Sequence, residues 1–508
     1  MGLIKSIWNF FNPKTEPIQE IAKPEIPKIQ AEMKPAPTKA KPEIPKIQAD
    51  MKPAPTKANP ESARIRRTVE KLAIQVGIDF GTSSTKIAYR QFGETKEVVP
   101  VIFGHHLASY PEYCMPSVAA YNNKGQLLLG EKAAKYIENR PWDEGLRRFK
   151  MLVAGLYDEA YGEEDTRNSY FEYLENTKQA GDTFHPIYLT ITYLVYIMQL
   201  TRKKIQEKNP NNELDLSFNV GIPVDQREKN AVFNAFQRIL AVAEILEKDV
   251  DTPDNIFQKA PSLFKEAIYD KRTTRIFAIP EAVAVIAPYT TSTRSREGIH
   301  VLIDFGSGTT DVSILNIKNK ELTVWYAAKH IPRGMHKVER IITKEIKAHM
   351  SEKDLVRLIQ SPAKWNQHLS GQVKNEITTL WKETHRAWSL AYKNNRIQSN
   401  WSADNVQIYT CGGGAQMRFI GEIFRKGGGL FNENPQFLLN YPVETMPIPD
   451  NYLNNTRVPF SRICLAYGLT TPEPELGEYT LPANAPDDTP PPLPVFEHPN
   501  PYHEQDVG

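Results

Sequence analysis

Residues 301–315 read VLIDFGSGTTDVSIL, two apolar runs separated by a glycine-rich turn. This pattern is typical of a β-hairpin. Asp304 stands just before the turn and Asp311 just after it. A second stretch, VGIDFGTSSTKIAY at residues 76–89, has Val, Ile, Asp, Phe, Gly and Thr at equal offsets. The near repetition predicts an internally duplicated body with one such hairpin in each half.

The composition of these turns indicates a phosphate-binding site. Glycines at a hairpin tip let the backbone approach a ligand and turn its N–H groups inward, which makes an anion cradle. A carboxylate beside the cradle would repel phosphate unless a cation lies between them, so Asp79 and Asp304 favour Mg²⁺. A third glycine run follows Cys411, between an expected strand and helix, where the backbone can approach a nucleoside. Hydroxyl donors beside the first two turns are supplied by Thr82, Ser83, Thr309 and Thr310.

The stretch between the two tails alternates strand and helix patterns. For example, LSFNVGIPV at residues 216–224 predicts a strand, and a strongly helical pattern follows it up to about residue 246. This alternation predicts an α/β body. We expect two lobes, at residues 72–290 and 291–470.

Composition and charge narrow the class of protein. Of the 508 residues, 40% are hydrophobic and 24% charged, as in ordinary soluble proteins. Residues 1–70 carry a net charge of +5, so the remainder totals −3, and we expect no nucleic-acid partner. The three cysteines fit no metal or disulfide spacing, and no apolar run is long enough to span a bilayer. We therefore expect a cytoplasmic body.

The two ends of the chain have different compositions from the body. Residues 1–11 place their apolar side chains on one helical face, which suggests docking through residues 3–11 to a partner or to the inner face of a membrane; an inert terminus is the alternative. Residues 12–71 form a Pro/Lys-rich linker with an 18-residue tandem repeat (23–40 and 41–58), which we expect to be disordered. Residues 471–508 contain ten prolines, and we expect them to be disordered too.

The three glycine motifs resemble the phosphate-one, phosphate-two and adenosine motifs of the actin-like ATPase superfamily. They are most similar to the nucleotide-binding domain of the 70-kDa heat-shock (DnaK-like) chaperones, and MPSVAAYNNKGQLLLGEKAAKY at residues 115–136 agrees in order. The resemblance covers about residues 74–470. It implies a two-lobed fold of duplicated ribonuclease-H-like domains with inserted subdomains. Ser307 departs from the glycine usual in these chaperones, and nothing after residue 470 resembles their peptide-binding domain.

The resemblance also implies roles for individual residues. Asp79 and Asp304 would hold hydrated Mg²⁺ with help from Asp311. Lys150, in LRRFKMLVAG, would neutralise the terminal phosphate and orient the attacking water, and Glu281, in IPEAVAVIAPY, would link hydrolysis to lobe closure. Thr309 is also expected at the catalytic centre. The residues expected to bind ATP or ADP are Gly81, Thr82, Ser83, Gly306, Ser307, Gly308 and Thr309 at the phosphates, Gly412, Gly413 and Gly414 at the nucleoside, and Glu383 and Arg386 at the adenine.

We therefore expect an enzyme that binds Mg-ATP and hydrolyses it slowly, acting as a nucleotide-driven switch for an unidentified protein partner. Two alternatives stay open at this point. One is an actin-like scaffold or filament that uses ATP to set assembly. The other is a sugar or metabolite kinase, since DFGTSST occurs in that branch of the superfamily too.

Overall fold

The computed structural model describes one unit of the chain, which lies within Thr68–Gly508. Neither the expected anchor nor the tandem repeat lies among the described residues. No described helix is both long and apolar enough to cross a membrane. The described residues are 71–93, 97–107, 110–138, 140, 145–162, 164–249, 251–318, 322–346, 371–395, 401, 405–416, 443–452 and 458–486.

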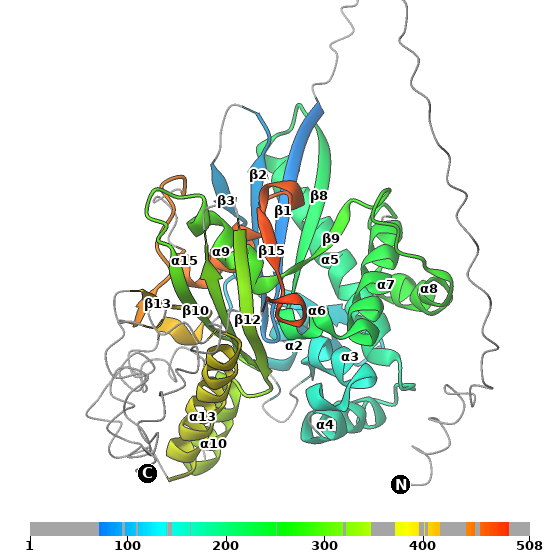
Figure 1. The fold of residues 1–508 in the computed structure, drawn as a ribbon. Coiled ribbons are helices and arrows are strands. Elements are labelled where there is room, and N and C mark those ends of the chain that lie inside the picture. The colour runs from blue at the N-terminus through cyan, green and yellow to red at the C-terminus, as the bar shows by residue number, and fades with distance from the viewer. Residues whose placement is uncertain are drawn as a thin grey trace, which may run out of the picture. The chain divides into compact units, whose positions relative to one another are not determined.

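The first sheet contains the first glycine hairpin (Figure 1). Its strand order is β3-β2-β1-β8-β9, with the short β4 beside β2. The hairpin of β1 and β2 is antiparallel, whereas β8 and β9 continue the sheet in parallel from the other edge of β1. The strands are β1 (Lys71–Phe80), β2 (Ser84–Gln91), β3 (Val98–Pro100), β4 (Met115–Pro116), β8 (Glu213–Ile222) and β9 (Ile276–Pro280).

The second sheet repeats this arrangement. Its order is β14-β13-β10-β11-β12-β15, with an antiparallel β10-β11-β12 meander and parallel β13 and β14. With the short β4 and the edge strand β15 set aside, both sheets place five strands in the order 3-2-1-4-5, which confirms the predicted duplication and the two-lobed actin-like α/β fold. The strands are β10 (Gly298–Phe305), β11 (Thr310–Ile317), β12 (Leu322–Ile331), β13 (Val406–Cys411), β14 (Val443–Thr445) and β15 (Glu478–Thr480).

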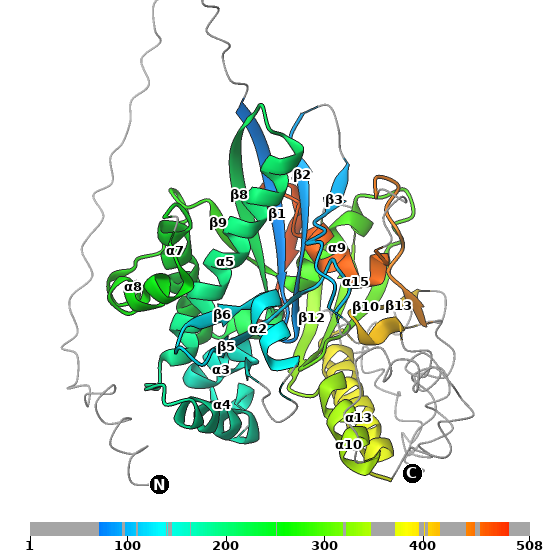
Figure 2. The ribbon, with the colours of Figure 1, turned by 180° about the vertical axis from the view of Figure 1, so that it is seen from behind.

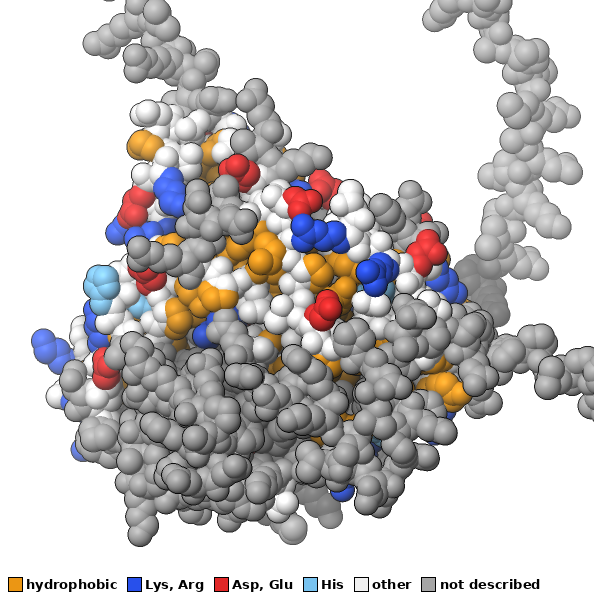
Figure 3. All heavy atoms as spheres, turned by 90° about the vertical axis from the view of Figure 1, so that its left-hand side faces the viewer, with side chains coloured by type: hydrophobic (Ala, Val, Ile, Leu, Met, Phe, Trp, Pro, Cys, Tyr) orange, Lys and Arg blue, Asp and Glu red, His pale blue; other side chains and the backbone are white. Residues whose placement is uncertain are grey.

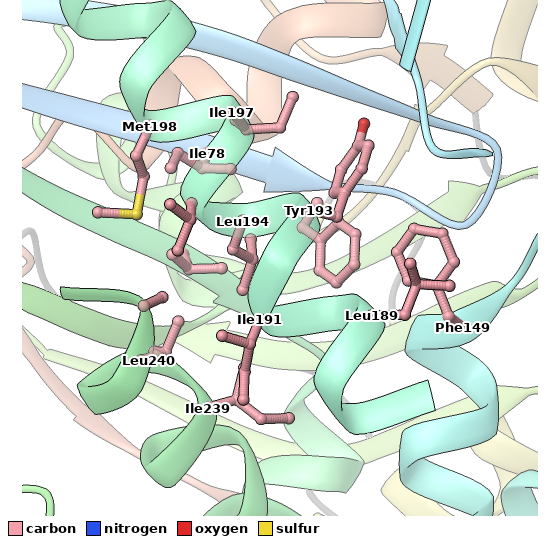
Figure 4. Close-up of a cluster of buried hydrophobic side chains, with 14 of the residues drawn as sticks. Ile78, Phe149, Leu189, Ile191, Tyr193, Leu194, Ile197, Met198, Ile239 and Leu240 are labelled. Carbon is pink, nitrogen blue, oxygen red and sulfur yellow. The ribbon is translucent and has the colours of Figure 1, made fainter. Parts of the chain in front are cut away.

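The core of the first lobe is built around α5 (His185–Lys208). Figure 4 shows apolar side chains of this helix, among them Ile191 and Leu194, between Ile78 of the first sheet and Leu240 of a neighbouring helix. These residues are almost fully buried. The helices that pack against α5 are α3 (Phe149–Tyr157), α7 (Asn230–Glu247) and α8 (Pro253–Glu266), and the short α6 (Val224–Glu228) precedes α7.

A smaller sheet with its own helices belongs to the first lobe. Its order is β6-β5-β7, and it lies close to α3 and α4 (Figure 2). The elements are β5 (Val118–Tyr121), β6 (Leu127–Leu129), β7 (Leu146–Arg147), α2 (Gly130–Glu138), η1 (Glu159–Tyr161) and α4 (Glu164–Asn176). This is an inserted subdomain of the kind expected.

Helices cover the second sheet and join the two lobes. Buried residues of α13 (Gly371–Asn394) pack on the second sheet, and α10 (Met335–Ile346) lies beside this helix. On the other side, α9 (Glu281–Thr290) and α15 (Phe460–Gly468) share one core cluster with residues of both sheets. Within the described residues, these two helices therefore connect the lobes, and the expected lobe boundary at residue 290 stays a prediction.

The structure corrects the expected C-terminal boundary. Residues 471–486 are part of the fold rather than a disordered tail, because β15 pairs in parallel with β12. A three-residue strand among prolines has no periodicity of its own and is defined only by its partner. The short elements here are η4 (Glu473–Glu475) and η5 (Pro482–Asn484), and η3 (Gly414–Gln416) follows β13.

One expected long helix is interrupted. The pattern after residue 224 predicts a single helix, but the helix is interrupted at Lys229, between α6 and α7, where the backbone is extended.

On the face shown in Figure 3, described hydrophobic side chains reach the surface between acidic and basic ones. The described part of that face is therefore mixed in character.

Candidate functional site

The two glycine turns face each other across the junction of the lobes. A Cβ atom added to Gly308 would lie 2.5 Å from Cγ2 of Thr82 and 2.9 Å from Sδ of Met151. The strand registers also correspond, since Asp79 pairs with Lys86 in the first hairpin and Asp304 with Asp311 in the second. The structure thus brings together the two turns that the sequence predicts as one site.

The tips of both turns present backbone donors. Within the described residues, the six N–H groups at the tips donate to no acceptor. The carbonyl oxygens of Gly306 and Ser307 instead accept the N–H groups of Met335 and His336, so the second turn is fixed to the start of α10. Partly buried N–H groups without acceptors on two apposed turns are suited to hold an anion. The six groups belong to Thr82, Ser83, Gly306, Ser307, Gly308 and Thr309.

Carboxylates gather immediately beside these donors. Asp304 is partly buried and makes no ion pair or hydrogen bond with the described residues. Burial, followed by the negative charge of three neighbouring carboxylates, raises the pKa of Asp304 to about 8. The arrangement therefore has an excess of negative charge that a bound cation would relieve. The three neighbours are Asp79, Glu281 and Asp311.

Asp79 differs from Asp304 because it has an ammonium partner. Nζ of Lys86 lies 2.6 Å from Oδ2 of Asp79, and both side chains are buried. Burial alone would lower the pKa of Lys86, but the Asp79 carboxylate outweighs burial and the pKa is raised. Our sequence reasoning missed Lys86. The signal was present, because Lys86 follows Asp79 at the same offset at which Asp311 follows Asp304.

Lys150 is held beside the first turn. Its Nζ donates to the carbonyl oxygen of Phe80 at 2.9 Å and pairs with Oε1 of Glu281 at 2.9 Å. The two charged side chains are only 11% and 12% exposed. Burial raises the pKa of Glu281, although the ammonium of Lys150 opposes this rise. Lys150 and Glu281, both predicted as site residues, therefore lie together next to the first glycine turn.

An aromatic cluster explains how Lys150 reaches this position. Phe80 follows Asp79, Phe149 precedes Lys150, and both rings pack on Tyr193 of α5, with ring centroids 5.7 and 5.3 Å from it. The hydroxyl of Tyr193 donates to the carbonyl oxygen of Pro116 at 3.0 Å. The first turn and the start of α3 are thereby fixed to one buried helix.

Asp311 is anchored by a histidine that the sequence did not suggest. Nδ1 of His330 lies 2.7 Å from Oδ1 of Asp311, across the β11–β12 ladder. Burial would lower the pKa of His330, but the Asp311 carboxylate outweighs it and the pKa is raised. The His330 ring also packs edge-on against Tyr161 of the first lobe, whose hydroxyl donates to Asp225 at 2.7 Å. Asp311 is thus connected to the opposite lobe.

The third glycine run lies directly behind Asp304. Gly412 has a φ of +81°, and a Cβ atom there would lie 2.1 Å from Oδ1 of Asp304. Its N–H donates to the carbonyl oxygen of Ser461, and the guanidinium of Arg462, another residue that we did not predict, lies over Gly413. Gly412 and Gly413 are therefore joined to the start of α15.

The two expected adenine-binding residues have other partners in this structure. Glu383 on α13 forms ion pairs with Lys329 of β12 and with Arg386 on its own helix. Within the described residues, neither Glu383 nor Arg386 has a polar contact with the glycine run at 412–414. Their expected role at the adenine stays a prediction.

The charge distribution fits a hydrated Mg²⁺ ion. The described residues contain no group of three or more His, Cys, Asp or Glu side chains that could enclose a metal directly. Mg²⁺ commonly keeps several waters and touches only one or two carboxylates beside phosphate oxygens. Asp304, with its raised pKa and no partner among the described residues, is the side chain best suited to such contact, and Asp79 and Asp311 are its nearest candidates for support.

Comparison with known proteins agrees with the fold. Residues 302–422 match the family model of the archaeal actin homologue MreB-like C-terminal domain. No curated protein matches the chain. The matched stretch begins in β10 and includes Asp304, Asp311 and the glycine run at 412–414. Together with the duplicated two-lobed fold, this match supports the chain as a member of the actin-like ATPase superfamily.

Proposed function

We propose that the protein binds Mg-ATP between its two glycine turns, hydrolyses it slowly, and uses the change of nucleotide to switch a partner protein. The observation that carries this proposal is the apposition of two turns whose six N–H groups are available to phosphate oxygens, beside a cluster of four carboxylates. Mg²⁺, when bound, would neutralise charge between these carboxylates and the phosphates.

The side chains of the site divide the work of phosphoryl transfer. Lys150 places its ammonium next to the carbonyl of Phe80, where it can stabilise charge that develops on the terminal phosphate. Glu281 fixes this ammonium and can accept a hydrogen bond from the attacking water. Lys86 supplies a second buried cation on the first turn. Most of the rate enhancement would come from such positioning and charge stabilisation.

The test is ATP turnover by the full chain at saturating Mg²⁺. We expect Asp304→Asn and Lys150→Ala each to reduce turnover by at least about 100-fold, the scale of a lost electrostatic contact in a transition state. Asp270→Asn is the matched control, because Asp270 lies in an exposed turn with Arg272. Turnover that is unchanged in both site variants would refute the assigned site.

The apposed turns allow a second test of the same site. Gly308→Ala should weaken binding of a fluorescent ATP analogue, because the new methyl group meets Cγ2 of Thr82. The double variant Gly308→Ala with Thr82→Ser removes that methyl and keeps the hydroxyl, so it should recover much of the affinity. Equal affinity in the wild type and Gly308→Ala would contradict closure of the two turns around the nucleotide.

Self-assembly is a second candidate output. The match to an archaeal actin homologue favours it, since actin-like proteins use nucleotide to set assembly. Sedimentation of the full chain at increasing concentration, with ADP or a non-hydrolysable ATP analogue, distinguishes the two outputs. Nucleotide-dependent pelleting supports the filament.

We propose further that residues 1–70 tether the body to its partner or to the inner face of a membrane. Affinity capture compares the full chain with a chain that begins at residue 71, in both nucleotide states. A partner that is retained in one nucleotide state and lost without residues 1–70 supports the tethered switch.

ATP use that requires a small hydroxylated acceptor would instead indicate the kinase.

A further inference from the structure

A second junction between the lobes lies beside the glycine turns. The short helix α6 of the first lobe packs against β12 of the second sheet (Figure 1). Next to this helix, the ring of Tyr161 in η1 packs edge-on against the imidazole of His330 in β12, with ring centroids 5.3 Å apart. The two residues belong neither to α9 nor to α15, so this junction is separate from the one that these helices form.

The first lobe presents the Tyr161 ring in a defined orientation. Tyr161 is only 3% exposed, and the side chain of His330 is equally buried. The hydroxyl of Tyr161 donates to Oδ2 of Asp225 at 2.7 Å, which fixes the ring to the start of α6. An edge-on aromatic contact is favourable beyond the burial of its two rings, and it depends on their orientation. The hydrogen bond to Asp225 therefore supports the contact with His330.

The position of Tyr161 is also set by α3, the helix next to both glycine turns. A Cβ atom added to Gly155 of α3 would lie 3.0 Å from Cα of Gly162, so the backbone of α3 touches the end of η1. Closer to its start, the same helix meets the second turn, because a Cβ atom at Gly308 would lie 2.9 Å from Sδ of Met151. One helix therefore places η1 in relation to the second glycine turn.

His330 connects the aromatic contact to the second glycine turn. Its Nδ1 lies 2.7 Å from Oδ1 of Asp311, and Oδ2 of the same carboxylate accepts the hydroxyl of Thr309 at 3.4 Å. Nε2 of His330 is buried and makes no hydrogen bond with the described residues, so packing against Tyr161 restrains the imidazole besides Asp311. A shift of the imidazole would therefore be transmitted to the Asp311 carboxylate and to the turn.

These contacts form one chain from the first lobe to the second. Its first two residues belong to the first lobe and the other three to the second. The contact between the two rings crosses from lobe to lobe, so it exists only while the lobes are close together. A contact that is made in the closed state and lost in the open one shifts the equilibrium toward closure. In order, the chain consists of Asp225, Tyr161, His330, Asp311 and Thr309.

We propose that Tyr161 and His330 are positioning residues, which hold the second glycine turn against the first lobe while nucleotide is bound. Their contact forms when the lobes close on the nucleotide and breaks before the nucleotide leaves. Neither side chain takes part in the chemistry, because Tyr161 acts through His330 and His330 acts through Asp311. This inference rests on the proposed function, since it concerns the same nucleotide site.

The test is the rate at which a fluorescent ADP analogue leaves the full chain, measured by stopped flow with excess unlabelled ADP at fixed Mg²⁺. Tyr161→Leu removes the aromatic ring. His330→Asn also removes a ring but keeps an amide donor near the position of Nδ1, so Asp311 keeps its partner. Each variant should release the analogue about two- to tenfold faster, the scale of one aromatic pair. The double variant should release it no faster than the faster single variant, because both substitutions remove the same contact.

Tyr188→Leu is the matched control, because Tyr188 makes an edge-on contact with Phe257 inside the first lobe. This variant should release the analogue at the wild-type rate. Tyr161→Phe lacks only the hydroxyl, and its ring can still pack on His330. It should therefore release the analogue more slowly than Tyr161→Leu does.

A single turnover of ATP, with the chain in excess, separates positioning from chemistry. Hydrolysis of bound ATP by His330→Asn should fall far less than hydrolysis by Asp304→Asn, because Asp311 keeps a hydrogen-bond donor. An equal loss in these two variants would overturn the assignment of His330 as a positioning residue.

Two results of the release experiment would also overturn the proposal. One is release at the wild-type rate in both single variants. The other is a double variant whose acceleration equals the product of the two single effects, because residues that share a contact do not act independently. Failure of the proposed function gives a different result, since the wild type itself would then not bind the analogue.

Discussion

At the scale of single residues, the two hairpins use the same geometry with different charges. Lys86 and Asp311 occupy corresponding positions opposite Asp79 and Asp304. The first hairpin therefore carries a buried ion pair and the second a pair of carboxylates. The charges of the first pair cancel, whereas the second pair carries two carboxylates on the opposite side of the same site, which suits a ligand that brings both phosphate and a metal ion.

The buried ion pair leads to a stability prediction. Lys86→Met keeps much of the apolar stem but leaves the Asp79 carboxylate buried without its ammonium. Breaking a buried pair in this way costs roughly 3–5 kcal/mol. We expect a matching fall in the free energy of unfolding, measured in urea. The double variant Lys86→Met with Asp79→Asn should recover part of the loss, because no unpaired charge remains. Similar stability of the single and double variants would contradict this account.

Two buried histidines predict a pH dependence. Burial lowers the pKa of His185 and of His300 to about 4, from an ordinary value of 6.5. As the pH falls below 6.5, the unfolded chain binds protons that the folded chain excludes, so stability is lost down to about pH 4. The slope is up to about 1.4 kcal/mol per pH unit for each histidine. The raised pKa of Asp304 opposes the two histidines over the same range, because there the folded chain binds a proton that the unfolded chain does not, so the net slope is smaller than the sum of the two histidine contributions. Unfolding in urea between pH 6.5 and 5 measures it.

His300→Gln is the control for this dependence. It should reduce the slope of the free energy of unfolding against pH by the contribution of one histidine, whatever its effect on the stability itself. His330 does not oppose the slope in this range. Its pKa is raised, so its contribution is complete below pH 6.5 and is lost only as the pH rises through the raised value. An identical slope in the wild type and His300→Gln would show that His300 is not kept neutral by the fold.

At the scale of elements, the turn after β13 supports the carboxylate of a neighbouring strand. Gly412 lies so close to Asp304 that no side chain fits between them, and β10 and β13 pair in parallel up to these residues. The third glycine run therefore has a structural reason besides the approach to a nucleoside that the sequence predicts. It allows the end of β13 to lie against the Asp304 carboxylate.

Gly412→Ala should therefore weaken nucleotide binding. The loss should be larger than the strain of placing an alanine at a positive φ would cause. The new Cβ atom would lie 2.1 Å from Oδ1 of Asp304 and must displace it. We expect at least about a tenfold loss of affinity for a fluorescent ATP analogue, together with a lower melting temperature. Gly104→Ala is the matched control, because Gly104 has a similar φ of +77° but nothing within 4 Å of the added atom. Equal losses in both variants would attribute the effect to φ alone.

At the scale of the whole molecule, two helices join the lobes. Gly468 of α15 lies against the backbone of α9, and a Cβ atom there would be 1.8 Å from the carbonyl oxygen of Ala284. Gly77 of β1 is also packed closely against α15, where a Cβ atom would be 2.2 Å from the carbonyl oxygen of Ala466. The helix α15 is therefore fixed both to β1 and to α9, the helix that follows β9.

Gly468→Ala should destabilise the whole fold, because backbone atoms cannot move aside as a side chain can. Overpacking of this kind costs about 3 kcal/mol. Thermal melting measures the effect. Gly162→Ala is the control, since its added atom would have only ordinary contacts, the nearest at 3.5 Å. A melting temperature of Gly468→Ala equal to that of the control would show that the two helices can separate at little cost.

Much of this fold could be predicted from sequence, for a physical reason. The hairpins, the glycine turns and the duplication are encoded locally, in residues that adjoin in the chain. Lys86 could also be predicted as a site residue by aligning the sequences of the two hairpins. His330 was not, because its contact with Asp311 depends on the register of two strands. The strand β15 could not be predicted from the sequence either, because only its pairing with β12 defines it.

The contact between α15 and β1 also bears on how the chain folds during synthesis. The strand β1 ends at Phe80, about 380 residues before the start of α15, the helix that covers the Gly77 face of this strand. Contacts between such distant segments form slowly, because a long loop must close first. Until then the apolar surface of the first lobe remains open to other chains. Folding of this protein should therefore be sensitive to the speed of translation and to chaperones that bind exposed strands.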